Sequence, residues 1–290
     1  MQYIGYLFFR LTVFIFSLIP FRAMYILSDG VAFLMHKVFG YRRKVIVENL
    51  KNSFPEKSSS EIEEIIKGTY KNLSDILLES VKGFSMSEAT MRKRYIFTNP
   101  QLAHDSELAG GSSIGMAAHC ANWEWGTISF PLYVNRCIIG YYKPLKNEYI
   151  DSFARKTRGI NGLELVPIGK TAWGFDNFKD TPSMHVLLSD QNPATHWTHW
   201  TTFLNQDTAC LLGGDKYAHL YNLPVYYVET LRVGRGFYNI QFEILTLTPN
   251  ELPAEVITKM YMTRLEKQIR AKPQDWLWSH KRWKIKRPVE

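Results

Sequence analysis

The sequence predicts an α/β protein with a mixed central sheet flanked by helices and an N-terminal membrane-anchoring helix. The chain has 290 residues, of which 46% are hydrophobic and 14% aromatic, and can therefore bury a large core. From about residue 111 onward, short apolar runs of strand length alternate with Gly, Pro, Asn and charged segments. Several intervals between these runs are long enough for the helical crossovers that parallel strands require.

The N-terminal segment over 3–21 is almost entirely apolar. Its longest part without a charge, LTVFIFSLIPF, is shorter than the roughly 20 residues that cross a bilayer, and Arg10 would have to lie near an interface. A membrane anchor or interfacial helix and a buried core helix both remain open. A second amphipathic stretch follows, and the cationic run at 41–44 favours the cytoplasmic side for the rest of the chain. We therefore expect membrane-associated helices over 1–40 and the main domain over 41–290.

A long amphipathic helix is expected over 58–83, because its apolar residues recur at three- and four-residue intervals. Ser60 and Glu63 have the spacing of a capping box at its start. The strand-length runs lie at 112–118, 137–142, 163–168, 184–189, 225–230 and 237–245.

The connections between these strands also carry local signals. Helical crossovers are expected around 147–158 and 173–179, and the glycines at 233–236 predict a hairpin turn. A final helix is expected over about 254–271, where Pro273 stops it.

Charge and cysteine content restrict the classes of partner and compartment. The net charge of +8 predicts an anionic partner, which could be nucleic acid, a membrane surface or a phosphorylated substrate. The three cysteines are scattered and odd in number, which argues against a disulfide framework or a cysteine zinc site and favours a reducing compartment.

The stretch AHCANWEWG places His119 and Glu124 five positions apart. The strand at 112–118 would deliver His119 at its carboxyl end, and Asn122 could then cap a helix that carries Glu124 in its first turn. There the helix dipole favours an ionised carboxylate that can accept a hydrogen bond from the imidazole. Such a pair can remove a proton from a substrate hydroxyl. The alternative is a buried histidine beside an unrelated surface glutamate.

The segment HCANWE resembles the His-x-x-x-x-Asp/Glu signature of the lysophospholipid and glycerolipid acyltransferase superfamily. Four further segments resemble the bacterial lipid A biosynthesis late acyltransferases, the lauroyl and myristoyl acyltransferase family. These segments are YRRKVIVENLKNSFPEKS, SDQNP at 189–193, FLNQDTACLLGGDKYA and PQDWLWSHKRWK. The similarity extends through almost the whole chain.

This resemblance implies a glycerolipid acyltransferase-like fold and a catalytic domain over 41–290. It also implies transfer of a fatty acyl chain from an acyl carrier protein or coenzyme A thioester to a hydroxyl of a lipid A precursor. His119 would be the general base and Glu124 would orient it, with no metal and no organic cofactor. The expected location is the cytoplasmic face of the inner membrane, with acyl carrier protein and the anionic membrane surface as partners.

Three other functions remain as alternatives. The acceptor could be a lysophospholipid or an aminolipid, or the chain could be a membrane-bound lipid-binding protein without turnover. A basic nucleic-acid module is a third alternative, although the sequence has no recognised nucleic-acid motif.

Three residues are predicted to bind substrate. Arg158 is preferred over Arg155 for a phosphate of the acceptor, because a guanidinium matches phosphate oxygens in pairs and the family has a functional arginine in this region. Asp190 follows the strand at 184–189, as an aspartate of the family does, and Asn122 completes the set. The alternatives are an ordinary solvated face for the arginines and a turn-forming role for Asp190.

Two further clusters are considered. His185, His196 and His199 suggest zinc, but 196–199 does not read as a helix and the expected metal content is none. Near the C-terminus, tryptophans alternate with cations, which fits an anionic membrane interface or a docking surface for the acidic carrier protein. These tryptophans are Trp276, Trp278 and Trp283.

Overall fold

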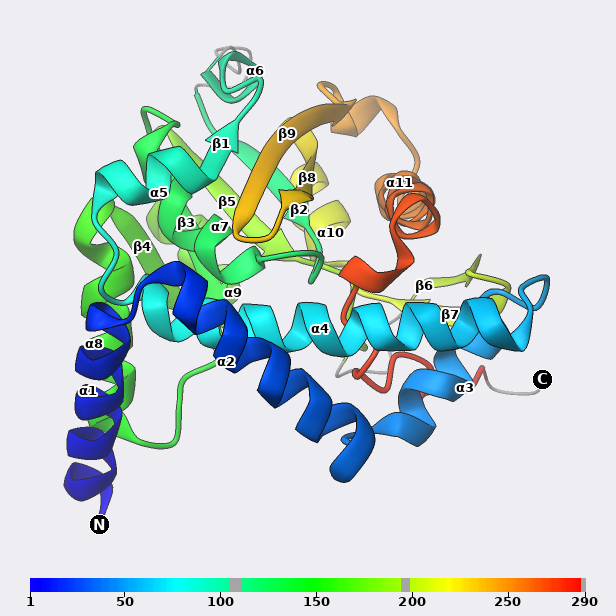
Figure 1. The fold of residues 1–290 in the computed structure, drawn as a ribbon. Helices are drawn as coiled ribbons and strands as arrows, with labels where there is room; N and C mark the ends of the chain where they lie inside the picture. Colours follow the sequence, from blue (N-terminus) through cyan, green and yellow to red (C-terminus); the bar gives the residue numbers. More distant parts are fainter. Residues whose placement is uncertain (105–110, 194–198, 288–290) are drawn as a thin grey trace.

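A computed structural model describes residues 1–104, 111–193 and 199–287 (Figure 1). Within them, a central sheet has the strand order β1-β9-β8-β2-β5-β3-β4. All neighbouring strands are parallel except the hairpin of β8 and β9. The predicted mixed sheet with flanking helices is therefore confirmed. Its strands are β1 (Tyr95–Phe97), β2 (Ser113–Ala117), β3 (Cys137–Tyr142), β4 (Leu163–Pro167), β5 (Ser183–Leu188), β8 (Val225–Gly234) and β9 (Phe237–Thr246).

Strand β2 lies inside the sheet, between β5 and β8. All five of its residues are buried, which explains why its sequence is a continuous run of small and apolar residues with no polar face. At Gly115 an added Cβ would lie only 3.1 Å from a methyl group of Val228 on β8. The centre of the sheet therefore has no room for a larger residue there.

Three strands were not expected from the sequence. β1 has three residues, too few for a periodic signal. β6 (His199–Phe203) and β7 (Gln206–Cys210) form a separate antiparallel pair and contain several polar residues. Leu204 and Asn205 turn the chain between them with positive φ angles of 50° and 62°, a conformation that a leucine rarely signals.

The longest helix, α4 (Ser59–Gly83), confirms the helix expected over 58–83, but the predicted capping box is wrong. Ser58 and Glu61 form the box: Ser58 N–H donates to Glu61 Oε2 at 2.8 Å, and Glu61 N–H donates to Ser58 Oγ at 3.3 Å. Glu63 is held instead by Arg43, at 2.9 Å. Each of the serines at 58–60 could cap the helix. Because Glu63 pairs with Arg43, the box forms between Ser58 and Glu61 instead.

The crossover helices and the hairpin turn are confirmed by α8, α9 and the Gly234–Phe237 connection, where Gly236 has a φ of 75°. The last helix, α11, ends at Ala271, just before Pro273. Besides α4 and several short 3-10 helices, the described helices are α1 (Gln2–Leu18), α2 (Phe21–Phe33), the π-helix η1 (Leu34–Val38), α3 (Arg43–Ser53), α5 (Glu88–Arg94), α6 (Gln101–His104), α7 (Trp123–Ser129), α8 (Glu148–Arg158), α9 (Thr171–Asn177), α10 (Gly213–Tyr221) and α11 (Val256–Ala271).

Helices α1 and α2 lie on the outer side of the molecule, next to α8 and α4 (Figure 1). Val13 is the buried residue of α1, so the alternative of a buried core helix is wrong for this segment. Large apolar side chains on α1 are exposed at Tyr3, Ile4, Leu7, Phe8, Leu11, Phe14, Ile15 and Leu18. In the described part of the chain, no helix has both the length and the apolarity of a bilayer span. The division between 1–40 and 41–290 stays a prediction.

Candidate active site

The carboxyl ends of two adjacent parallel strands bring together a histidine and an aspartate. β2 and β5 pair in register from Ser113 to Ala117, and each chain then continues two residues to His119 and Asp190. His119 Nδ1 lies 2.7 Å from Asp190 Oδ1, and the backbone N–H of His119 donates to Asp190 Oδ2 at 3.0 Å. The predicted position of both residues at strand ends is confirmed, and the sheet joins them into one pair.

The C-terminal segment holds this pair in place. Trp276 Nε1–H donates to Asp190 Oδ2 at 2.9 Å, so this carboxylate oxygen has two donors. The backbone N–H of Leu277 donates to the carbonyl of His119, and Ala121 N–H donates to the carbonyl of Asp275. Ala121 is fully buried with a φ of 49°, a left-handed conformation that these contacts support. Sequence reasoning did not predict Trp276 as a site residue, and its indole N–H gives no local signal.

Asn122 begins α7, as predicted. Its Oδ1 accepts from the N–H of Trp125 at 2.8 Å, and its Nδ2 donates to Glu79 Oε2 at 2.6 Å. Asn122 is fully buried, with both ends of its amide occupied. Both polar atoms of the Asn122 side chain thus have partners within the protein, and its predicted substrate-binding role stays a prediction. Its cap fixes the helix that carries Glu124.

Glu79, on α4, holds the Asn122 cap of α7 in place. Its carboxylate also accepts from Tyr25 and Tyr238, both at 2.7 Å, and burial raises its pKa. The carbonyl of Glu79 accepts from Trp125 Nε1 at 2.7 Å. The first turn of α7 is thus tied to the longest helix by both the side chain and the backbone of one residue.

Glu124 lies in the first turn of α7, as predicted, but it does not form the expected hydrogen bond with His119. It pairs with Arg158 Nη2 at 2.5 Å, at the end of α8. The physical reason is that His119 Nδ1 is already occupied by Asp190, while the Glu124 side chain is held on the Arg158 side. The orienting carboxylate is thus Asp190, which the sequence had suggested as a substrate ligand. Glu124 still lies close enough to His119 to raise its pKa electrostatically.

Burial and charge act on this pair in opposite directions. Burial lowers the pKa of His119, but the Asp190 carboxylate and its hydrogen bond outweigh that effect, so the pKa lies above its ordinary value of 6.5. Burial would raise the pKa of Asp190, yet the contacts from His119 and Trp276 hold it below its ordinary value. Asp190 is 2% exposed and the His119 side chain 17%, so only the imidazole can meet a ligand.

The geometry leaves one ring nitrogen available for chemistry. A neutral His119 that donates from Nδ1 to Asp190 has its lone pair on Nε2. Gln191 Nε2 lies 3.3 Å from this nitrogen, and the Trp123 ring packs edge-on at 5.2 Å. The neighbouring Cys120 is buried, and burial raises its pKa well above the ordinary value, so it is a poor nucleophile. The site can therefore act as a base, with the nucleophile supplied by the substrate.

Among the described residues, no group of His, Cys, Asp and Glu side chains could hold a metal ion. His185 is buried against Phe175, contacts Tyr141 Oη at 2.7 Å, and has its pKa lowered to about 4 by burial. His199 pairs with Glu255 at 2.7 Å. His196 lies outside the described residues.

The C-terminal tryptophans are buried, so their own side chains do not form the surface that the sequence suggested. Trp276, Trp278 and Trp283 are at most 9% exposed. Their indole N–H groups have internal acceptors in Asp190, Pro273 and Thr208, which allows full burial. Arg282 is 1% exposed, whereas Lys281 lies on the surface.

Residues 1–285 match the family model of the bacterial lipid A biosynthesis acyltransferases. No curated protein is similar enough to count as a match. Since the family match covers nearly the whole chain, including the His119–Asp190 site, the chain belongs to the bacterial lipid A biosynthesis acyltransferase family.

Proposed function

We propose that the protein transfers a fatty acyl chain from an acyl carrier protein or coenzyme A thioester to a hydroxyl of a lipid A precursor, with His119 as general base. The observation that carries this proposal is the His119–Asp190 pair, in which a buried carboxylate fixes Nδ1. Nε2 contacts the Gln191 amide, which the acceptor hydroxyl would displace. Family membership supports the class of acceptor.

The proposed reaction uses the two ring nitrogens in different roles. Nε2 takes the hydroxyl proton while the acceptor oxygen attacks the thioester carbonyl carbon. The C–S bond of the tetrahedral intermediate then breaks, and the imidazolium returns the proton to the leaving sulfur. Asp190 stabilises the imidazolium between these steps. The mechanism uses no metal and no organic cofactor.

Glu124 and Arg158 supply charge beside the base. In the proposed complex, Arg158 binds a phosphate of the acceptor, and Glu124 aims its guanidinium. The Glu124 carboxylate thereby raises the pKa of His119 and orients Arg158. It does not set the tautomer of the imidazole. Asp190 sets the tautomer, because its carboxylate accepts a hydrogen bond from Nδ1.

We also propose that the protein works at the cytoplasmic face of the inner membrane. The exposed apolar side chains of α1 support this location, since monomeric soluble proteins rarely expose contiguous patches of this kind. The cationic run at 41–44 would lie near anionic headgroups. Exposed lysines at 281, 284 and 286 offer a surface for the acidic carrier protein, in place of the buried tryptophans.

The function is tested with purified protein in detergent micelles. The protein is given radiolabelled acyl carrier protein or coenzyme A thioester and, as acceptor, a phosphorylated, acylated glucosamine disaccharide. We expect label on the disaccharide in an alkali-labile linkage, because an ester hydrolyses in mild base and an amide does not. Label only in free fatty acid, or only in an added lysophospholipid or aminolipid, would contradict the proposal.

A further inference from the structure

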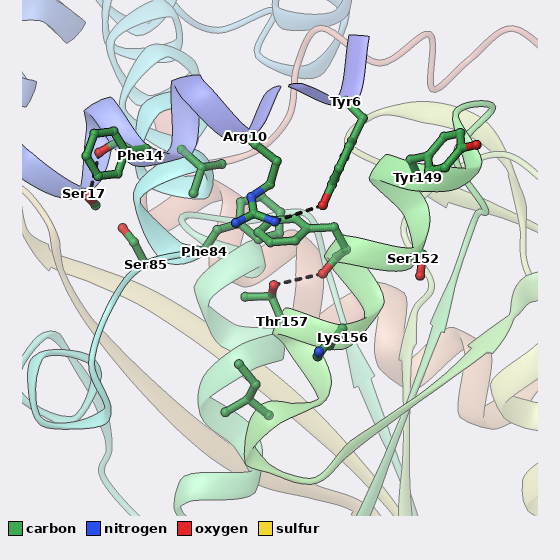
Figure 2. A pocket seen from close by; sticks show the side chains of 13 residues that line it. Tyr6, Arg10, Phe14, Ser17, Phe84, Ser85, Tyr149, Ser152, Lys156 and Thr157 are labelled. Carbon is green, nitrogen blue, oxygen red and sulfur yellow. Dashed lines mark hydrogen bonds between the residues drawn. The ribbon is translucent and has the colours of Figure 1, made fainter. Parts of the chain in front are cut away.

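A pocket of about 660 Å³ lies between α1 and α8, beside the end of α4 (Figure 2). Its walls are largely aromatic and aliphatic. Phe9, Phe84 and Phe153 pack edge-on or tilted against one another next to it, with ring centroids 5.5–5.9 Å apart. The apolar lining residues include Val13, Phe14, Phe84, Phe153 and Ile160. Such walls suit the hydrocarbon part of an amphiphile.

Two cations line the same pocket. Arg10 is the charged residue of α1, and Figure 2 shows its side chain extending towards α8, which carries Lys156. Arg10 Nη1 donates to Tyr6 Oη at 2.9 Å, and the guanidinium stacks over Phe153 at 4.7 Å. A guanidinium has five N–H donors, so most of them remain for a ligand. Among the described residues, neither Arg10 nor Lys156 has a carboxylate partner.

The pocket lies near the Arg158–Glu124 pair. Phe84 in its wall lies 6.0 Å from the guanidinium of Arg158, which pairs with Glu124. On its other side, α1 presents the exposed apolar residues described above, including Phe14. An amphiphile held in this pocket would therefore lie between the apolar surface of α1 and the Arg158–Glu124 pair.

We propose that this pocket binds the acceptor lipid through a phosphate group placed between Arg10 and Lys156, with hydrocarbon along Phe14 and Phe84. This phosphate is distinct from the one that we propose for Arg158. The inference rests on the proposed function and deepens it, because it names a phosphate-recognition site in the N-terminal helix. A fixed cation in an apolar helix is stabilised when an anion pairs with it, and a phosphate supplies that charge.

The test measures binding and does not require turnover. His119→Ala protein in detergent micelles is titrated calorimetrically with the phosphorylated, acylated glucosamine disaccharide, with its dephosphorylated form and with inorganic phosphate. Changing both Arg10→Gln and Lys156→Gln should weaken binding of the phosphorylated lipid about 10- to 100-fold and leave the dephosphorylated lipid unaffected. Arg22→Gln with Lys93→Gln removes the same charge from exposed positions outside the pocket and should leave both dissociation constants unchanged.

Arg10→Lys with Lys156→Arg keeps both charges and should retain most of the affinity, which controls for loss of fold. Unchanged binding in the double glutamine variant, or equal weakening for both lipids, would overturn the proposal. Inorganic phosphate that binds as tightly as the phosphorylated lipid would overturn the lipid assignment. If wild-type protein binds the phosphorylated lipid through these residues but transfers no acyl chain, the proposed function fails while the pocket assignment stands.

Discussion

His119→Ala should lower the rate of acyl transfer by about two to four orders of magnitude, the range that general base catalysis contributes. Without the imidazole, the acceptor hydroxyl must attack while still protonated. The neighbouring thiol of Cys120 cannot substitute, since burial raises its pKa. The measurement is the initial rate of labelled acceptor formation at saturating donor and acceptor.

His199→Ala is the matched control, because His199 also pairs with a carboxylate but lies on β6, in the separate two-stranded sheet. Its rate should remain that of the wild type. A His119→Ala protein that forms product as fast as the wild type would remove the assignment of His119 as base.

Asp190→Asn should lower the rate of acyl transfer by a comparable factor, about two to four orders of magnitude, although the side chain keeps almost the same volume. An amide at position 190 can donate to Nδ1, which moves the ring proton to Nε2 and removes the lone pair that the acceptor needs. The oxygen of the amide can still accept from Trp276, so the fold of the C-terminal segment should persist. Initial rates, together with near-ultraviolet circular dichroism, separate the loss of chemistry from a loss of packing.

Trp276→Phe is the companion variant, because it removes one donor to Asp190 and leaves the contact with His119 in place. It should lower the rate less than Asp190→Asn does. Wild-type turnover by Asp190→Asn would show that this carboxylate does not set the tautomer of His119.

Local signals in the sequence were enough for much of the framework. The run of small and apolar residues at 112–118 predicted strand β2, and the strand placed His119 at its carboxyl end. Asn122 was predicted as a helix cap because its side chain can reach the backbone three residues ahead, as it does. The apolar residues of α4 recur every three or four positions, and this pattern predicted the helix almost to the residue.

The proposed catalytic pair depends on contacts that residue spacing does not encode. His119 and Asp190 are 71 positions apart and meet only because β2 and β5 are neighbours in the sheet. Glu124 was favoured as the partner of His119 because it is close in sequence, yet Arg158, 34 positions away, holds it. Strand order and helix placement are long-range properties, and no local pattern in one sequence specifies them.

The C-terminal tryptophans show that local composition does not predict whether a segment is buried. Aromatic residues that alternate with cations resemble an interface, but the same pattern suits a buried segment whose indole N–H groups all find acceptors. Trp276 contacts an aspartate 86 positions earlier, and this contact turns the segment inward. Whether these tryptophans are buried depends on the acceptors of their indole N–H groups, and the local sequence does not identify those acceptors.

The pH dependence of kcat/KM, compared between the wild type, Asp190→Asn and Glu124→Gln, tests most directly whether an Asp190-held imidazole is the base. His119 must be neutral to accept a proton, so activity should fall as the pH drops through its pKa, which lies above 6.5 in the wild type. Removing the Asp190 charge leaves burial as the larger influence, so the acid limb should move to lower pH in Asp190→Asn, and by a smaller step in Glu124→Gln. An acid limb at the same pH in the wild type and in Asp190→Asn would contradict the account.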